Sequence, residues 1–532
     1  MLAAPELFPG SASAGERKRG IVHWPETMPE TSAPRPRRLP PGILWPALLL
    51  LLGVGGALLW LATGPLRSRP VRVLLVVPEP SPEAGVSHYQ ARALSLVFQD
   101  GLESSPQTAV TLATGMPQRP ELIRRPEPWL LVRILPRRQQ DRLGLSLEWA
   151  WSPSLSLGSR AWDRAEFSGS SPREVFRQAL AALPVHQGAL QVDALLPGSA
   201  GSFWELVQAD TLRLQNDERE QAIALARSVT QGEPEAAEGW FILGRLLYRG
   251  LLDVPEASTP DRLDEAETCF RMGLGLVPEH PKGVFQLAQL KTNQGEHREA
   301  LEDLLEALQR RPRNPLLLAG LAYSARNAGL LELAREASLR RDRWSFPEVQ
   351  PLGIEFLALY LGDQARFEAT LQDQPGHLRS VVQRFFRGYL ALMRQDRRAA
   401  TEAFASAEAA PRGYPQYVRL ARAFRLGAQG EAKESGAALR ALELDRVGLR
   451  VPDGEFTLRL AEGFALAGET DHAMELAERA FAQGFGAAAW YEASPFLGPL
   501  RQSPRWKSLL QHVRERQELL KARFPVARLP RD

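Results

Sequence analysis

The pattern of hydrophobic and polar residues changes four times along the chain. The first stretch has no apolar period and the second is apolar throughout. The third mixes short apolar runs with a helical pattern, the fourth repeats a helical pattern, and a short C-terminal stretch follows. We divide the chain accordingly into residues 1–42, 43–63, 70–185, 203–487 and 488–532.

The second stretch has the length and composition of a membrane span. Residues 1–42, rich in Pro, Ser, Gly, Glu and Arg, predict a disordered tail. Ile43–Ala62 then gives twenty uncharged residues, about 30 Å of helix, the thickness of the hydrocarbon core. Trp45 and Trp60 lie near its ends, where indole rings favour the membrane interface. We expect an uncleaved, single-pass transmembrane helix that anchors the protein in the lipid bilayer.

Two questions about this span stay open on the sequence. A cleaved signal peptide is the alternative, because translation from Met28 would shorten the leader. The arginines close to the span are balanced on its two sides, so the orientation is not fixed by them. Arg17, Lys18 and Arg19 add positive charge farther out, which favours a cytoplasmic N terminus. The bulk of the chain would then be extracytoplasmic, in the periplasm.

Residues 70–185 predict a small α/β domain. Val71–Val77 is a β-branched run that ends at a proline, as a buried strand does. Apolar residues at helical spacing follow, and later segments alternate with period two, with a polar hairpin turn at 136–142. Ser170 or Ser171 caps the closing helix, with Pro172 at its first position. The expected elements are strands at 71–77, 110–113, 129–135, 143–151 and 159–167, and helices at 88–103 and 172–183.

This order of elements resembles the TolB-type amino-terminal-like domain. Asp100-Gly101-Leu102 stands where that family ends its first helix, and Arg173–Leu180 stands where its closing helix lies. The proline-phenylalanine pair that usually follows the first strand is missing, and Val77-Pro78 takes its place. The resemblance implies a non-enzymatic domain between a membrane span and a repeat array.

Residues 203–487 repeat with a period of 34. Ala266, Ala300 and Ala334 are each 34 apart, as small residues would be at the close crossing of two helices in successive repeats. Trp240-x-x-Leu243-Gly244 resembles the opening of the tetratricopeptide repeat. The resemblance implies an α-solenoid, with units that start near residues 203, 237, 281, 315, 349, 381, 416 and 454. The fold class that we expect is therefore mostly α: a tetratricopeptide-repeat α-solenoid after one transmembrane helix and a small α/β domain.

In such repeats the first helix of each unit lines a concave groove that holds peptides or protein segments. Polar and aromatic side chains at the groove-facing places can grip a peptide backbone and supply contact area. Ordinary packing between repeats is the alternative for each of them. The predicted protein-binding residues are Gln289, Asn293, Tyr323, Arg326, Asn327, Phe385 and Tyr389.

The chemistry that the sequence lacks narrows the class of function. Net charge is +3, which does not favour nucleic-acid binding. The chain has one cysteine, Cys269, and no P-loop, nucleophile elbow or pair of histidines at metal-ligand spacing. We expect no catalytic residue, no cofactor and no metal, and hence a protein that is not an enzyme.

Residues 496–510 resemble the ending that follows such repeats in membrane-anchored bacterial regulators with kinase, cyclase or winged-helix domains. We expect a capping helix there. The function that we expect is a membrane-anchored, non-enzymatic adaptor with a protein or peptide partner in the repeat groove. Two alternatives remain: the sensor half of a split signalling system that acts with a separate kinase or cyclase, and an envelope-assembly factor. The sequence does not indicate an oligomeric state.

Overall fold

The computed structural model describes residues 71–77, 84–103, 105, 107–114, 129–139, 142–152, 162–185, 191–212, 218–253, 257–278, 280–346, 356–371, 380–410 and 414–531. Within these ranges no helix is both long enough and apolar enough to cross a membrane. The predicted tail at 1–42 and the predicted span at 43–63 lie outside the described residues, as do Met28 and the predicted start of the fifth repeat at 349.

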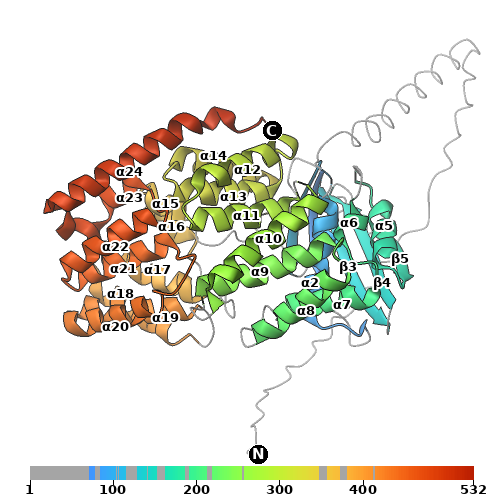
Figure 1. Ribbon diagram of the computed structural model, residues 1–532, viewed down its shortest axis with the longest axis horizontal. Helices are drawn as coiled ribbons and strands as arrows, with labels where there is room; N and C mark the ends of the chain where they lie inside the picture. Colours follow the sequence, from blue (N-terminus) through green and yellow to red (C-terminus); the bar gives the residue numbers. More distant parts are fainter. Residues whose placement is uncertain are drawn as a thin grey trace, which may run out of the picture. The chain divides into compact units, whose positions relative to one another are not determined.

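The described chain is mostly helical, with a five-stranded sheet near its N-terminal end, as the sequence predicts (Figure 1). The strands are β1 (Val71–Val77), β2 (Thr108–Thr114), β3 (Trp129–Gln139), β4 (Arg142–Trp151) and β5 (Asp163–Gly169). The helices before the repeats are α2 (His88–Glu103), α5 (Pro172–Ala182) and α6 (Val192–Leu195). The later helices are α7 (Ala200–Leu212), α8 (Arg219–Gly232), α9 (Ala237–Asp253), α10 (Pro260–Leu276), α11 (Pro281–Asn293), α12 (His297–Arg310), α13 (Pro315–Asn327), α14 (Leu331–Trp344), α15 (Phe356–Tyr360), α16 (Gln364–Ala369), α17 (Ser380–Met393), α18 (Arg397–Glu408), α19 (Pro415–Gln429), α20 (Ala432–Leu444), α21 (Gly454–Leu466), α22 (Thr470–Ala482), α23 (Ala488–Ala493) and α24 (Pro504–Arg523), with 3-10 helices η5 (Pro495–Gln502) and η6 (Val526–Arg528).

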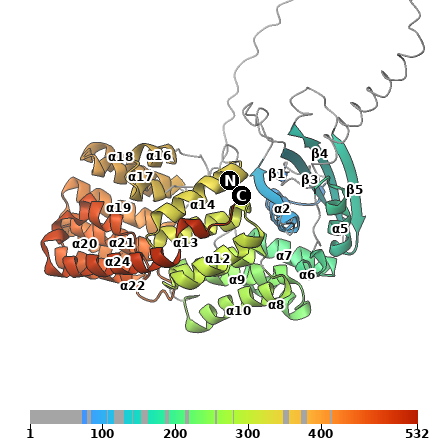
Figure 2. The same cartoon turned by 90° about the horizontal axis from the view of Figure 1, so that it is seen from above.

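The sheet has the strand order β2-β1-β3-β4-β5. Strand β1 is parallel to both β2 and β3, whereas β3, β4 and β5 form an antiparallel meander. Because side chains alternate between faces, Val73, Leu130 and Leu145 share one face, which packs against α2 and α5 (Figure 2). The predicted polar turn at 136–142 is shorter than expected, since β3 continues to Gln139 and pairs with β4 to that point.

Successive antiparallel helix pairs follow the sheet, and the 34-residue period marks their crossings. The three alanines that lie 34 residues apart, Ala266, Ala300 and Ala334, are completely buried on second helices, as are Ala222 on α8, Ala400 on α18 and Ala473 on α22. The glycines on first helices meet aromatic rings, because a Cβ at Gly244 would lie 2.8 Å from Phe270 and one at Gly388 would lie 2.7 Å from Phe404. The small residues therefore stand where helices cross closely.

The α/β region and the first helix pairs share one hydrophobic core. Leu94 on α2, Phe203 on α7 and Phe241 on α9 belong to the same buried cluster. A buried ammonium group strengthens this junction, since Lys282 on α11 pairs with Asp100 on α2 at 2.8 Å and with Glu238 on α9. Within the described residues the predicted α/β domain is thus continuous with the array.

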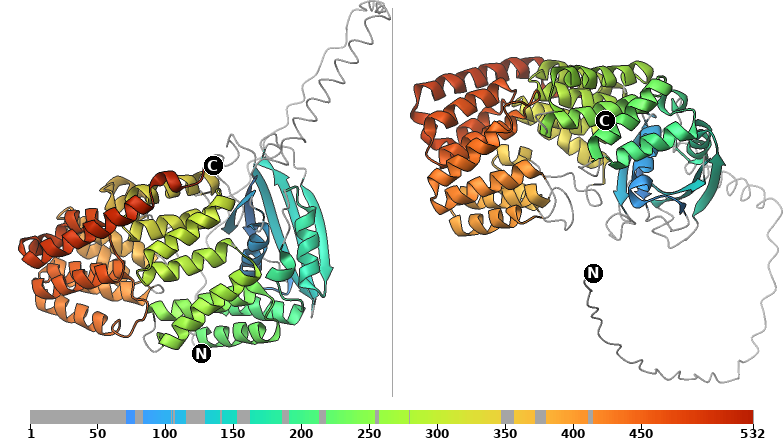
Figure 3. Two further views of the ribbon diagram at one scale, coloured as in Figure 1. Left: turned by 45° about the horizontal axis from the view of Figure 1, so that its top comes forward. Right: turned by 60° about the horizontal axis from the view of Figure 1, so that its bottom comes forward.

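Helix α21, the first helix of the last predicted repeat, lies inside the array (Figure 3). Every residue from Gly454 to Ala465 is buried, so the helix has no solvent face. The loop that follows α22 also packs against the middle helix pairs, because the Gly486 amide donates to the Asn327 carbonyl at 2.7 Å. The last helix pair therefore closes back on α11–α14.

Helix α24 extends this closure. Its N-terminal half buries Trp506, Leu509 and Val513 against the last helices, as the predicted capping role requires. Its end reaches farther than predicted, because Phe524 and Leu529 join the hydrophobic cluster of α12–α14. The C terminus accordingly lies beside α14 (Figure 1).

Candidate functional site

The predicted groove residues lie on first helices, but most of their side chains are covered. Phe385 and Tyr389 on α17 have no exposed surface. Asn293 and Asn327 are 7% and 4% exposed, and Gln289, Tyr323 and Arg326 are partly buried. With Phe385 and Tyr389, these five residues make up the predicted set of seven. Phe385, Tyr389, Asn293 and Asn327 are therefore covered by the rest of the chain, and their role in protein binding stays a prediction.

Hydrogen bonds link predicted residues of α11 and α13 to each other and to Tyr248 on α9. Tyr323 donates its hydroxyl to the Asn293 side-chain oxygen at 2.7 Å. The Asn293 amide group in turn donates to the Tyr248 hydroxyl on α9 at 2.6 Å. Asn327 donates to the carbonyl of Tyr323 at 3.0 Å, which holds it within its own helix. These side chains connect three neighbouring first helices.

Helix α21 supplies the partner of Arg326. The guanidinium of Arg326 pairs with Glu455 at 2.8 Å, and Tyr360 on α15 donates its hydroxyl to the other oxygen of the same carboxylate. The Arg326 guanidinium also lies 5.3 Å from the ring centre of Tyr323 and 5.2 Å from that of Phe356. Beside Arg326, the predicted groove is therefore filled by helix α21 of the same chain.

One turn farther along α21, Arg459 and Glu462 form a buried ion pair at 2.6 Å, with 1% and 0% of their side chains exposed. Glu462 also accepts hydrogen bonds from Tyr389 at 2.7 Å, Ser494 at 2.7 Å and Trp490 at 3.0 Å. Arg459 donates to both tyrosine hydroxyls within reach, those of Tyr360 and Tyr389. Every oxygen of the Glu462 carboxylate has a donor, as a buried charge requires.

Electrostatics favour this pairing. Burial alone lowers the pKa of Arg459, but Glu462 and the two tyrosines raise it well above its usual value, so the guanidinium stays charged. Burial, and then the negative charge of Glu462, raise the pKa of Tyr389 far above its usual range. The tyrosines thus remain donors. We name the side chains of Arg326, Tyr360, Tyr389, Glu455, Arg459 and Glu462 the α21 network.

The sequence analysis missed the α21 half of this network. Arg459 and Glu462 lie three residues apart in a helix that is otherwise apolar on several sides, Gly454–Leu466. A charged pair inside such a helix is the signal that could have indicated burial, because charges usually mark a solvent face. The 34-residue period gives no information on which distant helix covers the groove.

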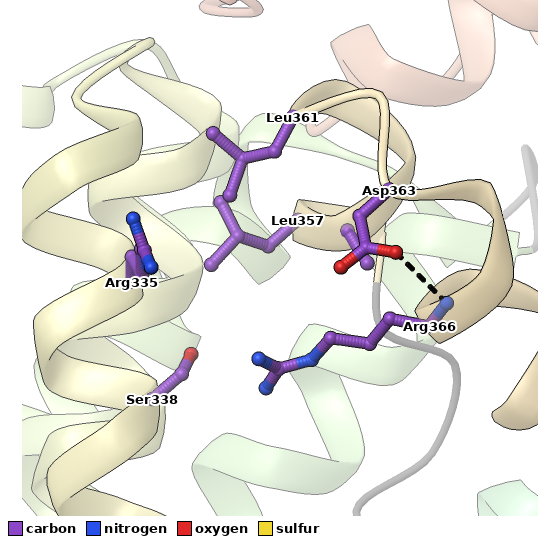
Figure 4. A pocket seen from close by; sticks show the side chains of 7 residues that line it. Arg335, Ser338, Leu357, Leu361, Asp363 and Arg366 are labelled. Atoms are coloured by element: carbon purple, nitrogen blue, oxygen red, sulfur yellow. Dashed lines mark hydrogen bonds between the residues drawn. The ribbon is translucent and has the colours of Figure 1, made fainter.

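A second feature is an open hollow of about 270 Å³ beside the α14–α16 junction (Figure 4). Arg335 and Ser338 line it from α14. Leu357 and Leu361 line it from α15 and the turn after it, and Arg366 from α16. Ala358 and Asp363 complete the lining. None of these seven residues was predicted as a site.

Asp363 and Arg366 give the hollow both signs of charge. One oxygen of Asp363 caps α16 by accepting the Arg366 backbone amide at 3.0 Å, and its second oxygen faces the hollow (Figure 4). The Arg366 guanidinium extends across the hollow toward Ser338, and Arg335 lies on the opposite wall (Figure 4). The arrangement can bind ions and apolar groups, but the structure places no base beside a nucleophile there.

In the part of the chain that the structure describes, nothing indicates a metal site or a reactive thiol. No group of three or more His, Cys, Asp or Glu side chains is placed to hold a metal ion there. Cys269 is buried, and burial raises the pKa of its thiol to about 12, so it is an inert core residue at neutral pH. Burial lowers the pKa of His280 to about 3.

No protein-family model matches this sequence, and no curated protein matches it.

Proposed function

We propose that the protein is a membrane-anchored, non-enzymatic adaptor whose tetratricopeptide-like helix pairs recruit a protein partner. The observation that carries the proposal is the stack of helix pairs with completely buried alanines at its crossings. Repeat stacks of this kind expose long helical faces on which another protein can bind. The predicted anchor at 43–62 would hold the stack at the membrane surface.

The α21 network changes where the partner would bind. Because Arg326 and Tyr389 already contact α21, the central groove has an internal occupant. We therefore assign partner binding to the outside of the array. Leu444 and Val447, at the end of α20, are each 72% exposed, and large apolar side chains with this exposure are suited to an interface.

Recovery of partners from detergent extracts tests the proposal. Tagged full-length protein is used as bait, and its partners are cross-linked and identified. Substitution of Leu444→Asp with Val447→Asp should remove a specific partner, whereas Arg398→Gln on the exposed face of α18 should not. A bait that recovers no partner above a no-tag control, from the membrane of its own cell, would contradict the adaptor function.

A further inference from the structure

We propose that the contact between α2 and the helical array is a pH-sensitive switch, in which the carboxyl group of Glu103 holds the contact closed when it is protonated and loosens it when it is ionised. Helix α2 belongs to the α/β region, whereas α11 and α13 belong to the array. The proton on Glu103 therefore controls how firmly the array is held against the α/β region. The inference does not depend on the adaptor function.

The Glu103 carboxyl group lies buried at the end of α2, and the residue is only 1% exposed. Gln99 donates to its Oε1 atom at 2.8 Å, but its Oε2 atom is buried and has no hydrogen-bond donor among the described residues. From the array, Arg311 donates to the Glu103 backbone carbonyl. Asn314, which interacts with the carboxyl group, itself caps the first amides of α13. A neutral carboxyl group needs fewer donors than a carboxylate, so these surroundings favour the protonated form.

Two cations near this end of α2 already pair with other carboxylates. Lys282 on α11 is shared between Asp100 on α2 and Glu238 on α9. Arg245 on α9 pairs with Asp210 on α7. Burial raises the pKa values of Asp100 and Glu238, and Lys282 opposes that shift in both. A third carboxylate would therefore add a negative charge to a cluster whose ammonium group already serves two.

The surroundings of Glu103 oppose its ionisation near neutral pH. Burial raises its pKa to about 7, and the negative charge of Asp100 adds to this shift. The hydrogen bonds to the carboxyl group and the charge of Arg311 lower the pKa, but by less than burial raises it. His280 supplies no positive charge, because burial lowers its pKa to about 3. The carboxyl group thus changes its charge close to neutral pH.

The direction of the pH effect follows from the pKa of Glu103 in the two states. In the unfolded chain the pKa has its ordinary value of 4.5, whereas in the folded chain it is about 7. Between these values the folded chain binds one proton more, so the stability that this group contributes is complete below pH 4.5 and is lost as the pH rises to 7. From pH 5 to pH 8 the equilibrium constant for opening should rise about 70-fold through this group alone.

Hydrogen–deuterium exchange of the purified full-length protein in detergent, read by mass spectrometry, tests the proposal. Wild type and Glu103→Gln are compared at pH 5.5 and at pH 8, because glutamine keeps the shape of the carboxyl group and cannot ionise. For peptides from α2 and from the starts of α11 and α13, the ratio of the exchange rates of wild type and variant should rise at least tenfold between the two pH values. For peptides from α18–α20 the ratio should stay constant.

Glu402→Gln, which changes a side chain that is 67% exposed on α18, is the matched control and should leave the exchange of α2 unchanged at both pH values. A ratio for α2 that is the same at both pH values would overturn the proposal, because a merely structural role of Glu103 would not depend on pH. If the variant does not fold, wild type alone decides. After correction for the intrinsic exchange rates, the protection of α2 should fall between pH 5.5 and pH 8 by more than that of α20, and equal changes would overturn the proposal.

Discussion

The α21 network and the hollow beside α14–α16 both gather charged side chains, but they differ in what covers those side chains. In the network, α21 covers the inner side chains of the array, as the contact of Arg326 with Glu455 illustrates. In the hollow, by contrast, Leu361 is 41% exposed.

The two regions use their charged residues differently. In the α21 network, charges are buried and each is held by several donors or acceptors, so they act in packing. In the hollow, Arg335 and Asp363 are exposed at a concave surface, where a charge is available to a ligand. The buried charges of the α21 network therefore stabilise the fold, whereas the side chains of Arg335 and Asp363 face solvent.

The largest effect that we expect comes from the buried carboxylate. Glu462→Ala would leave Arg459 charged in the core and remove the acceptor of three other side chains, Tyr389, Trp490 and Ser494. Loss of one partner of a buried pair should lower the free energy of unfolding by about 3–5 kcal/mol. Urea unfolding measures it. Glu402→Ala, at a 67% exposed position, is the control and should change stability by less than about 0.5 kcal/mol.

The next effect is the pH dependence of the contact between α12 and the turn after α22, where His297 lies against Gly484. Burial, and then the charge of Arg516, lower the pKa of His297 to about 4. Between pH 6.5 and 4 the histidine is protonated in the unfolded chain but not in the folded chain. The free energy of unfolding is therefore unaffected by this group above pH 6.5, and it falls as the pH drops from 6.5 toward 4. The slope from this group should be about 1.4 kcal/mol per pH unit.

His297→Gln isolates this slope, because every other titrating group is common to the two proteins. Glutamine can still donate to the Gly484 carbonyl, which His297 contacts at 2.5 Å. The stability difference between wild type and variant should therefore depend on pH between 6.5 and 4, as measured by unfolding at a series of pH values. A difference that is constant over this range would mean that His297 is not buried.

A smaller loss is expected at the turn between α13 and α14. Gly329 has a φ of +86°, and a Cβ there would lie 2.1 Å from the Gly486 carbonyl oxygen. Gly468 has a φ of +81° but nothing within 4 Å of such a Cβ. Gly329→Ala should therefore cost about 1–3 kcal/mol more than Gly468→Ala in thermal unfolding. Equal losses would show that the loop after α22 does not pack on this turn.

The smallest effect is expected in the hollow. Arg335→Gln should alter the free energy of unfolding by less than about 0.5 kcal/mol, because this side chain is exposed and supports no part of the core. The measurement is thermal unfolding of wild type and variant. A loss similar to that of Glu462→Ala would assign Arg335 to packing and remove the contrast between the two regions.

The elements that local sequence determines were predicted well. Strand β1 and helix α2 begin and end where the apolar runs indicate, and Ser171 caps α5 by accepting the Glu174 amide at 3.4 Å. The starts of α9, α11, α13 and α21 coincide with the predicted repeat starts. Periodicity succeeds here because the buried face of a helix or strand recurs at its own spacing.

Contacts between distant segments were not predicted. The sequence placed Phe385 and Tyr389 on the inner face of the array, but it could not show that α21 covers that face, because nothing local encodes a pairing over 73 residues such as Tyr389 with Glu462. Asp210 on α7 is a similar case, because its carboxylate pairs with Arg245 on α9.

The most direct test of the account is a double-mutant cycle between α13 and α21. Arg326→Met and Glu455→Gln are made singly and together, and the free energy of unfolding of each protein is measured in urea. Because the two side chains are in contact at 2.8 Å, the account predicts a coupling energy of about 0.5–3 kcal/mol. Effects that add within about 0.3 kcal/mol would mean that α21 does not occupy the groove, and would contradict the account.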